Sequence, residues 1–305
     1  MRLATPDAIV CGGYNYLASW QAKSWARNHR VPLILWVEST DKDRRSRNRA
    51  IEFLKVRFMR GCSAFVVPGG SSFEYLRNYG TAEEDIFTAP NAVDTEQFAQ
   101  RAAATRRDVV GHRESLRLPK RFFLFVGRLV PEKGVFDLLN AYGKLAPELR
   151  REVGLVFVGE GEARTELVRR AIPVVPGCVQ CAGFIHREQL ASYYALADAF
   201  VFPSHSDPWG LVVNEAMACG LPVIASDAAG CTADLVRENW NGRVVRGGEV
   251  AELASALEDL ARDSAQRSLM GSRSRERIAR FSPEACAAGI ANAVLSHVAQ
   301  QMQTS

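Results

Sequence analysis

Short apolar runs alternate with stretches whose apolar residues recur at helical spacing, and this pattern occurs twice along the chain. The first occurrence predicts strands and helices at residues 8–11, 17–25, 32–37, 64–67, 71–80 and 86–88. The second predicts strands at residues 122–126, 154–158, 179–182, 199–202 and 222–225. Its helices are expected at residues 135–145, 163–170, 187–195, 213–218, 249–262 and 283–300. Continuous apolar strands separated by helices are typical of parallel sheets covered on both faces, so we expect an α/β fold.

Composition narrows the class of protein. The 305 residues suffice for two domains, and the 47% apolar content excludes a disordered chain. The net charge of +4 comes from 38 basic and 34 acidic residues, so no nucleic-acid partner is indicated. No run approaches the ~18 apolar residues of a membrane span, and the N-terminus lacks the apolar core of a signal peptide. We therefore expect a cytoplasmic location.

The cysteines indicate a reducing compartment. There are seven, an odd number, and they are scattered rather than arranged as a disulfide framework. Cys178 and Cys181 form a lone CxxC, which supplies half of a zinc site, and we interpret them as two partly buried thiols.

The first candidate for chemistry lies at residues 127–134, where the strand 122–126 runs into a helix. Ligands of open α/β sheets bind beyond the carboxyl ends of strands, and a helix N-terminus there favours phosphate. Arg128 and Lys133 add two cations at the same edge. This spacing favours an anion site over two solvated surface residues.

The second candidate lies at residues 204–220, which also join a strand to a helix. The amides of residues 210–212 would lie at that helix N-terminus, where they can bind an anion. Asp207 precedes the turn, and Glu215 lies about one turn inside the helix. The two carboxylates suit a polyhydroxylated ligand such as a sugar or ribose. In the alternative interpretation, Asp207 forms the turn and Glu215 is a solvated helix residue.

Four motifs follow one another through the second occurrence of the strand–helix pattern, which we call the second lobe; the first occurrence is the first lobe. The motifs are Gly127-Arg128-Leu129 with Lys133-Gly134, Val158-Gly159-Glu160-Gly161, Gly183-Phe184-Ile185, and Asp207 with Glu215-Ala216-Met217-Ala218-Cys219-Gly220. In these motifs, residues 122–281 resemble glycosyltransferase family 4, also called the group 1 glycosyl transferases, which are retaining enzymes of the GT-B fold. The resemblance extends more weakly into the first lobe, through residues 66–71 and 90–94. It implies two Rossmann-like lobes, the first incomplete, with the C-terminal helix packing back on the first lobe.

The resemblance also assigns roles to residues. Arg128 and Lys133 would hold the donor diphosphate, and Glu215 would bind the ribose of the nucleotide. Asp207 occupies the first position of the family's E-x₇-E pair, one methylene shorter than the usual glutamate, and with Lys133 it is expected to be catalytic. The further donor-binding residues implied are Ile185 at the base, Trp209, and the backbone amides of Gly210, Leu211 and Val212.

The implied reaction transfers a sugar with retention from a nucleotide sugar, expected to be a UDP-sugar, to a hydroxyl of a glycan, lipid or small molecule. No metal or other cofactor is expected, because Arg128, Lys133 and the helix dipole would stabilise the leaving diphosphate. The pair Asp41 and Asp43 is distant from these motifs in the sequence. Two alternatives stay open: a non-catalytic or hydrolysis-only nucleotide-sugar-binding remnant, and a sugar-nucleotide epimerase of the same fold.

The first lobe offers weaker candidates. Gly12, Gly13 and Tyr14 follow a strand and are expected to line an acceptor-side cleft. Glu38 follows the next strand, where many members of the family carry a histidine on the catalytic side. It is either a third catalytic residue, acting on the sugar or the acceptor proton, or a loop carboxylate paired with nearby arginines.

Residues 42–60 carry eight basic residues interleaved with apolar ones. A helix here would have a cationic and an apolar face, which suits peripheral contact with the inner face of a membrane. A core helix with an ordinary solvated face fits the same pattern.

Domain boundaries follow from these assignments. We expect a partial acceptor-side lobe at 1–98, a polar linker without a pattern at 99–119, a donor-binding lobe at 120–282 and a returning helix at 283–305. About 100 residues are few for the first lobe, which predicts an exposed sheet edge at residues 7–11 and either a truncated form or a misplaced gene start.

Overall fold

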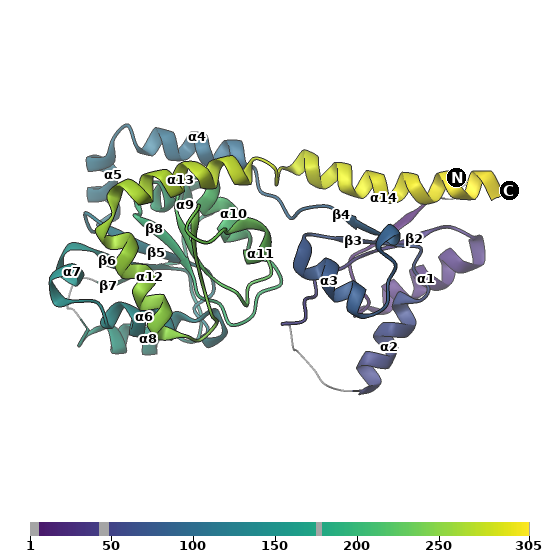
Figure 1. The fold of residues 1–305 in the computed structure, drawn as a ribbon, viewed down its shortest axis with the longest axis horizontal. Coiled ribbons are helices and arrows are strands. Elements are labelled where there is room, and N and C mark those ends of the chain that lie inside the picture. Colours follow the sequence, from purple (N-terminus) through teal and green to yellow (C-terminus); the bar gives the residue numbers. More distant parts are fainter. Residues whose placement is uncertain (1–5, 43–48, 175–178, 305) are drawn as a thin grey trace. The chain divides into compact units, whose positions relative to one another are not determined.

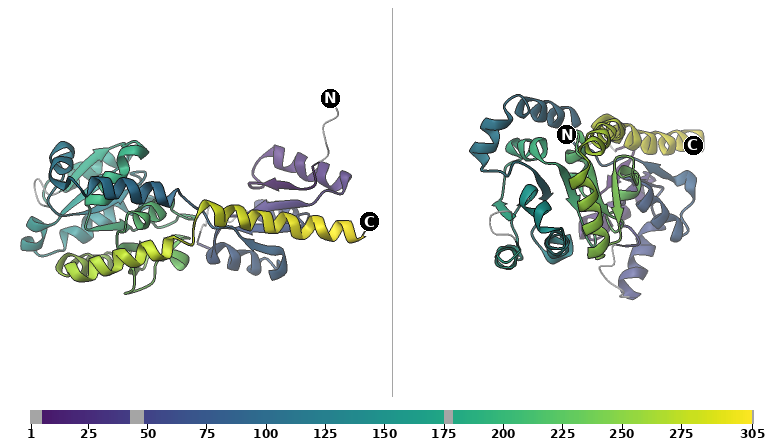
Figure 2. Two further views of the ribbon diagram at one scale, coloured as in Figure 1. Left: turned by 90° about the horizontal axis from the view of Figure 1, so that it is seen from above. Right: turned by 60° about the vertical axis from the view of Figure 1, so that its left-hand side comes forward.

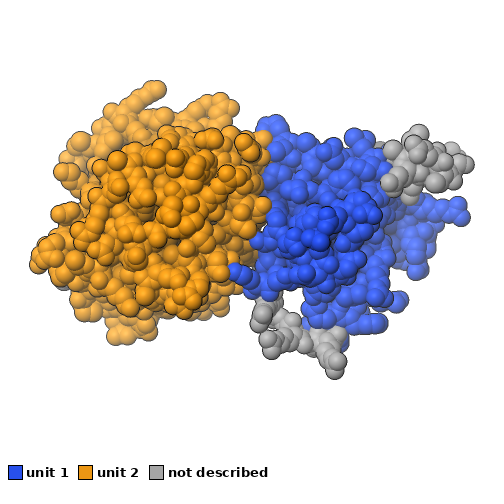
Figure 3. Space-filling model, in the orientation of Figure 1, with its two compact units in different colours: residues 1–91, 283–305 blue, residues 92–282 orange. Residues whose placement is uncertain are grey.

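The protein divides into two compact units, each built on one parallel sheet. The computed structural model describes residues 6–42, 49–174 and 179–304. Unit 1 comprises residues 1–91 and 283–305, and unit 2 comprises residues 92–282 (Figure 3). The α/β class with two Rossmann-like lobes is confirmed.

Unit 1 contains a sheet of four parallel strands in the order β1-β2-β3-β4 (Figure 1). The strands are β1 (Ile9–Cys11), β2 (Leu33–Trp36), β3 (Ala64–Val67) and β4 (Ile86–Thr88). Its helices are α1 (Leu17–His29), α2 (Arg49–Met59), α3 (Gly70–Asn78), the 3₁₀ turn η1 (Glu83–Asp85) and α14 (Pro283–Thr304). The edge expected at residues 7–11 is present, because β1 is the outer strand and Val10 is 44% exposed.

The two faces of this sheet are covered by different parts of the chain. Successive side chains of a strand point to opposite faces, so Leu33 and Leu35 pack with Phe58 of α2, whereas Ile34 packs with Ala293 of α14. Helix α14 lies along β3 and β4 (Figures 1 and 2). The C-terminal helix thus packs on the first lobe, as the resemblance implies.

Unit 2 contains six parallel strands in the order β10-β9-β8-β5-β6-β7. They are β5 (Phe122–Val126), β6 (Gly154–Val158), β7 (Val179–Gly183), β8 (Ala199–Phe202), β9 (Val223–Ser226) and β10 (Gly242–Val245). The helices that precede or join them are α4 (Thr95–Thr105), α5 (Val109–Leu116), η2 (Pro131–Lys133), α6 (Val135–Gly143), α7 (Pro147–Glu152), α8 (Arg164–Ala171), α9 (Arg187–Leu196), α10 (Leu211–Ala218) and α11 (Thr232–Leu235). Helices α12 (Val250–Arg262) and α13 (Ser264–Ile278) follow the last strand.

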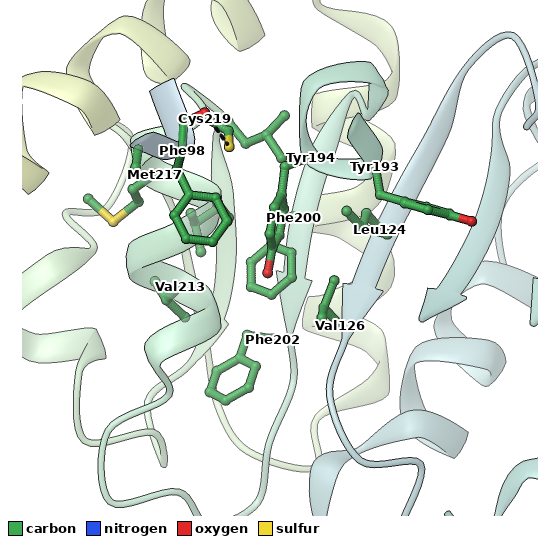
Figure 4. Close-up of a cluster of buried hydrophobic side chains, with 14 of the residues drawn as sticks. Phe98, Leu124, Val126, Tyr193, Tyr194, Phe200, Phe202, Val213, Met217 and Cys219 are labelled. Carbon is green, nitrogen blue, oxygen red and sulfur yellow. Dashed lines mark hydrogen bonds between the residues drawn. The ribbon is translucent and has the colours of Figure 1, made fainter. Parts of the chain in front are cut away.

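Both faces of this sheet are packed with apolar side chains. On β5, Leu124 and Val126 face the cluster formed with α9 and α10, and Phe123 and Phe125 face the opposite cluster. Figure 4 shows the first of these clusters, in which the rings of Phe98, Tyr194 and Phe200 lie between helices and sheet. The buried core fixes the strands whose ends carry the candidate motifs.

The direction of winding reverses between β5 and β8. The chain passes from β5 to β6 and β7 on one side, then returns to place β8, β9 and β10 on the other. Strands β5 and β8 are therefore neighbours at a topological switch point, the position where open α/β sheets bind ligands. The candidate motifs at residues 127–134 and 204–220 follow these two strands.

A close backbone approach joins the segments that follow these two strands. Gly134 has φ +69°, and a Cβ atom there would lie 2.1 Å from the carbonyl oxygen of Pro203. The Glu132 carbonyl oxygen also accepts hydrogen bonds from the His205 amide at 2.9 Å and the Ser204 hydroxyl at 3.2 Å. Glycine is required here because any side chain would drive the two segments apart.

Several elements differ from the sequence predictions. Helices α4 and α5 occupy most of the segment 99–119, which was expected to be an irregular linker. Phe98, Ala102 and Thr105 are the buried residues of α4, and with a single large apolar side chain among them the periodic signal is weak. Strand β10 was missed because Arg243 interrupts its apolar run at the sheet edge. Helix α13 was missed because it is largely polar.

Some predictions fall outside the described residues. Arg44, Arg45 and Arg47 of the basic run and Cys178 of the CxxC lie there. Cys181 is described as a free thiol that is partly buried, and burial raises its pKa.

The contact between Gly134 and Pro203 can be tested by a single methyl group. Gly134→Ala should lower the free energy of unfolding by about 1–3 kcal/mol more than Gly248→Ala, as measured by urea denaturation. Gly248 has a similar φ of +84°, but a Cβ atom there would meet nothing within 4 Å, so it isolates backbone strain, about 1–2 kcal/mol. Equal costs for the two variants would contradict the close approach.

Candidate functional site

The loops after β5 and β6 are bound to each other. The Leu129 amide donates to the Glu160 carbonyl oxygen at 2.8 Å. A Cβ atom on Gly159, which has φ +134°, would lie 1.9 Å from the carbonyl oxygen of Gly127. The glycine motifs noted in the sequence therefore allow adjacent loops to pack backbone against backbone at the carboxyl edge of the sheet.

Lys133 and Asp207 form an ion pair across the two candidate motifs. The Lys133 ammonium donates to Asp207 Oδ2 at 2.5 Å and approaches the Ser206 carbonyl oxygen at 3.4 Å. The side chains are 14% and 16% exposed. Asp207 Oδ1 accepts from the Trp209 amide at 3.0 Å, which fixes the carboxylate as well. The two residues predicted to be catalytic on the donor side are thus in direct contact.

The turn before α10 depends on Gly210, which has φ +95° and precedes Leu211. A Cβ atom there would lie 2.6 Å from the Phe202 ring, so β8 and the helix N-terminus approach closely. The first amides of a helix, here those around Leu211 and Val212, have no acceptor within the helix and can bind an oxygen anion. This geometry is what the sequence led us to expect.

The side chain of Trp209, which the resemblance implies to be donor-binding, is buried. It is 4% exposed, and its indole N–H donates to Asn214 Oδ1 at 3.0 Å. The ring packs near Phe281. The indole is therefore part of the core, and the group of Trp209 that contacts the predicted site is its backbone amide, which donates to Asp207 Oδ1.

Glu215 lies one turn inside α10 and is 9% exposed. Its Oε2 accepts a hydrogen bond from the buried Tyr194 hydroxyl at 3.0 Å. Burial raises the pKa of Glu215, while the Tyr194 hydrogen bond and the charge of Arg187 oppose that rise. The interpretation of Glu215 as a solvated helix residue is wrong, because the carboxylate is buried and held at one oxygen.

Sequence reasoning missed three residues of this edge. Tyr194 orients Glu215 by a hydrogen bond. Its role could have been suspected because a buried tyrosine hydroxyl needs a hydrogen-bond acceptor. His205 Nε2 lies 2.5 Å from Asp137 Oδ2, in the first turn of α6. His205 belongs to the second motif and Asp137 follows the first, so this pair is another link between the two segments.

The other donor-side candidates lie at the same edge. Arg128 directly follows β5 and Gly127. Ile185 follows β7 and packs, partly buried, against the apolar cluster that contains Trp209. Strands β7 and β5 are separated by β6, so Ile185 lies further along the edge than the Lys133–Asp207 pair.

The first-lobe candidates lie at the carboxyl ends of β1 and β2. Gly13 has φ +137°, and the Tyr14 carbonyl oxygen accepts from the Trp20 indole at 3.0 Å. Gly12 is exposed and, like Gly13, has open space where a Cβ atom would stand.

Glu38 is exposed, and its contacts differ from the pairing with arginines that one interpretation of the sequence expects. Its Oε1 accepts from Asn91 Nδ2 at 2.9 Å and from the Trp36 indole at 3.3 Å. Both of these donors are neutral, so within the described residues they take the place of the expected arginines.

The described part of the chain contains neither a cluster of metal-ligating side chains nor a helix that could span a membrane. Among residues 6–42, 49–174 and 179–304, no three His, Cys, Asp or Glu side chains are grouped to hold a metal ion. In the same residues, no helix is both long and apolar enough to cross a membrane.

A parallel sheet with cations, free helix amides and a buried carboxylate at its switch point defines a lobe of the kind that binds nucleotides and sugar phosphates. Comparison with protein families gives the class. Residues 112–277 match the model described as "Glycosyl transferases group 1", and residues 1–97 match "Glycosyltransferase Family 4". The chain belongs to the group 1 glycosyl transferases.

Individual relatives agree with this family. The chain is 31% identical to a D-inositol 3-phosphate glycosyltransferase of Xylanimonas cellulosilytica, over 71% of this chain and 52% of the relative. It is 30% identical to a sulfoquinovosyl transferase of Arabidopsis thaliana, over 78% of this chain and 45% of the relative. The chain spans about half the length of the curated relatives it matches.

Solved structures share the fold. HepE of Anabaena in complex with UDP superposes with a TM-score of 0.73 at 20% identity, covering 94% of this chain and 76% of that one. The α,α-trehalose 6-phosphate synthase of Burkholderia multivorans gives 0.78 at 18% identity, covering 98% and 73%. These likenesses establish the two-lobed fold.

The Tyr194–Glu215 hydrogen bond predicts a pH-dependent effect. Tyr194→Phe removes a donor to the buried carboxylate and should lower the free energy of unfolding by about 1–3 kcal/mol at pH 7. The folded-state pKa of Glu215 is already raised, and it rises further in the variant, so the cost should shrink as the pH falls and Glu215 becomes protonated. Urea denaturation at pH 7 and pH 5 measures this.

The neighbouring Tyr193→Phe is the matched control, because Tyr193 is equally part of the core but does not hydrogen-bond to Glu215. Its cost should not change between the two pH values. A cost of Tyr194→Phe that is the same at both would contradict a hydrogen bond to the ionised carboxylate.

Proposed function

We propose that this protein is a retaining glycosyltransferase that moves a sugar from a nucleotide-sugar donor to a hydroxyl acceptor without a metal ion. Unit 2 is the donor-binding lobe and unit 1 the acceptor-side lobe in this proposal. The observation that carries it is the Lys133–Asp207 ion pair between the segments that follow β5 and β8 at the switch point of one sheet, with the buried Glu215 on α10, the helix that begins after Asp207. Membership of the group 1 glycosyl transferases supports the same reaction class.

The donor diphosphate would bind where positive charge is concentrated. Lys133 and Arg128 supply two cations, and the N-terminus of α10 supplies amide donors. In the absence of donor, Lys133 is neutralised by Asp207. A diphosphate would compete for the ammonium, which would leave Asp207 able to accept hydrogen bonds from sugar hydroxyls.

Glu215 would accept hydrogen bonds from the ribose hydroxyls through the oxygen that Tyr194 does not hold. Its burial strengthens such bonds, because the surrounding dielectric is low. Ile185 would contact the base. UDP is the nucleotide we propose, supported by the Anabaena relative of the same fold that was solved with UDP and with UDP-glucose.

In the transfer step, the bond from the anomeric carbon to the phosphate oxygen breaks, and the acceptor oxygen bonds to that carbon on the same face. The leaving phosphate oxygen takes the acceptor's proton, so charge and atoms balance. Lys133 and Arg128 would stabilise the negative charge that develops on the leaving group, which is the role a cation plays in metal-dependent transferases. Glu38 in unit 1 is proposed to contact the sugar or the acceptor. A cytoplasmic location accords with these substrates.

Lys133→Ala should weaken UDP binding by about 10–100-fold in isothermal titration calorimetry, because a charge-assisted contact to phosphate is lost. Lys144→Ala is the control: this lysine caps the opposite end of α6 and should leave UDP binding unchanged. GDP and ADP, titrated in parallel, should bind more weakly than UDP. Unchanged UDP affinity in Lys133→Ala would rule out the assigned phosphate site.

UDP affinity should also be the same in excess EDTA and in excess Mg²⁺, because protein cations provide the counter-charge. Loss of binding in EDTA that Mg²⁺ restores would contradict the metal-independent mechanism.

Transferase activity is measured by incubating the protein with a radiolabelled UDP-sugar and hydroxyl acceptors. The expected product contains the sugar joined to the acceptor. Hydrolysis alone would favour a remnant that no longer transfers.

A further inference from the structure

A cavity of about 710 Å³ lies in unit 1, where α1 meets the C-terminal half of α2. Four cationic side chains line it: Lys23 and Arg27 from α1, Arg57 from α2, and Arg60 immediately after it. Two aromatic residues, Trp20 and Phe53, complete its lining on opposite helices. Of the described residues that line it, none is acidic. The cavity is far along the sequence from the proposed donor site and belongs to a different unit.

The cations of this cavity are not neutralised by carboxylates of the described residues. The Lys23 ammonium donates to the carbonyl oxygens of Arg57 and Phe58 at 2.5 and 2.7 Å, so it ties α1 to the end of α2. Within residues 6–42, 49–174 and 179–304, no carboxylate forms a salt bridge with Arg27, Arg57 or Arg60. Burial lowers the pKa of Lys23, and the nearby charges of Arg57 and Arg27 lower it further against the opposing effect of Cys62. An anion in the cavity would relieve this crowding of like charges.

The outer face of α2 is apolar where a solvated helix would be polar. Ile51, Phe53 and Leu54 are 46%, 67% and 50% exposed. Lys55, in contrast, is 5% exposed and bonded to Glu52 and Tyr79. Three large apolar side chains of this helix are therefore exposed while Lys55 is buried, whereas Phe58 and Met59 pack in the core.

The apolar and cationic groups lie side by side. Phe53, Arg57 and Arg60 follow one another at intervals of four and three residues, so they form one stripe, and Phe53 both lines the cavity and projects beyond it. Arginines beside an exposed aromatic and two exposed aliphatic residues match a ligand that joins an anionic group to hydrocarbon. A nucleic acid would use the cations but not Ile51 and Leu54.

We propose that the α1–α2 cavity binds the phosphate headgroup of an anionic lipid at a membrane surface, while Phe53, Ile51 and Leu54 enter the boundary between headgroups and acyl chains. Arg27, Arg57 and Arg60 bind the phosphate oxygens. The contact is then made by two helices, whereas the sequence indicated the basic segment 42–60 alone. It does not depend on the donor site.

The test is sedimentation of the full chain with vesicles. Vesicles of phosphatidylcholine with one third phosphatidylglycerol should bind the protein, and vesicles of phosphatidylcholine alone should bind it at least about tenfold more weakly. Arg57→Glu with Arg60→Glu should reduce binding to the anionic vesicles at least about tenfold. Phe53→Ser should also reduce it, at unchanged net charge.

Two matched controls separate this surface from general effects. Arg107→Glu with Lys120→Glu makes the same change of net charge on exposed residues of unit 2 and should leave vesicle binding unchanged. Phe184→Ser removes an aromatic side chain that is also 67% exposed and should likewise have no effect on vesicle binding. Circular dichroism of each variant verifies that the fold is intact. If Arg57→Glu with Arg60→Glu fails this check, Arg57→Gln with Arg60→Gln replaces it.

Three results would overturn the proposal. These are equal binding to neutral and anionic vesicles, equal losses in the cavity variants and their controls, and binding of inorganic phosphate, measured by calorimetry, with no binding to anionic vesicles. The last result would identify a site for free phosphate. UDP binding, measured in the same Arg57→Glu, Arg60→Glu variant, should be unaffected, so failure here and failure of the donor site are distinguishable.

Discussion

The approach of Gly134 to Pro203 is the constraint on which the candidate site of unit 2 depends. Parallel strands bring their carboxyl ends to one edge, but side chains on two loops meet only if the backbones come close. Here a Cβ atom at Gly134 would lie 2.1 Å from the Pro203 oxygen, and the Glu132 carbonyl oxygen accepts two hydrogen bonds from the second loop. Lys133 and Asp207 lie next to these points in the chain, so their ion pair is a consequence of backbone geometry.

Several ionisable side chains at this edge have partners within the protein. Lys133 faces Asp207, His205 faces Asp137, and Glu215 is held by a neutral tyrosine hydroxyl. Such pairing keeps partly buried charges from being isolated, which is costly. It also orients them, because each side chain has a fixed partner. In the proposed function, a ligand with a diphosphate at one end and hydroxyls at the other would exchange partners with these groups.

The strands of both sheets, apart from β10, could be predicted from the sequence, because uninterrupted apolar runs such as Phe122–Val126 are typical of strands buried on both faces. The contact of Lys133 with Asp207 followed from motif positions after β5 and β8, once those strands proved to be neighbours. The burial of the Trp209 indole could not be predicted, because an aromatic residue in a turn before a glycine suits a ligand pocket and a core equally. Tyr194 was missed because its partner, Glu215, is 21 residues away and only the packing of α9 on α10 brings them together.

Unit 1 is assembled from two separate parts of the chain. Strands β3 and β4 are buried on one face by α14, whose residues follow the whole of unit 2 in the sequence. During synthesis, therefore, unit 2 is complete and free to fold while the sheet of unit 1 still has a bare apolar face. The ribosome must deliver the last helix before that face is covered, which reverses the usual order in which N-terminal domains fold first. Until then, apolar side chains such as Ile34, Ala64 and Val66 lack the packing that α14 provides.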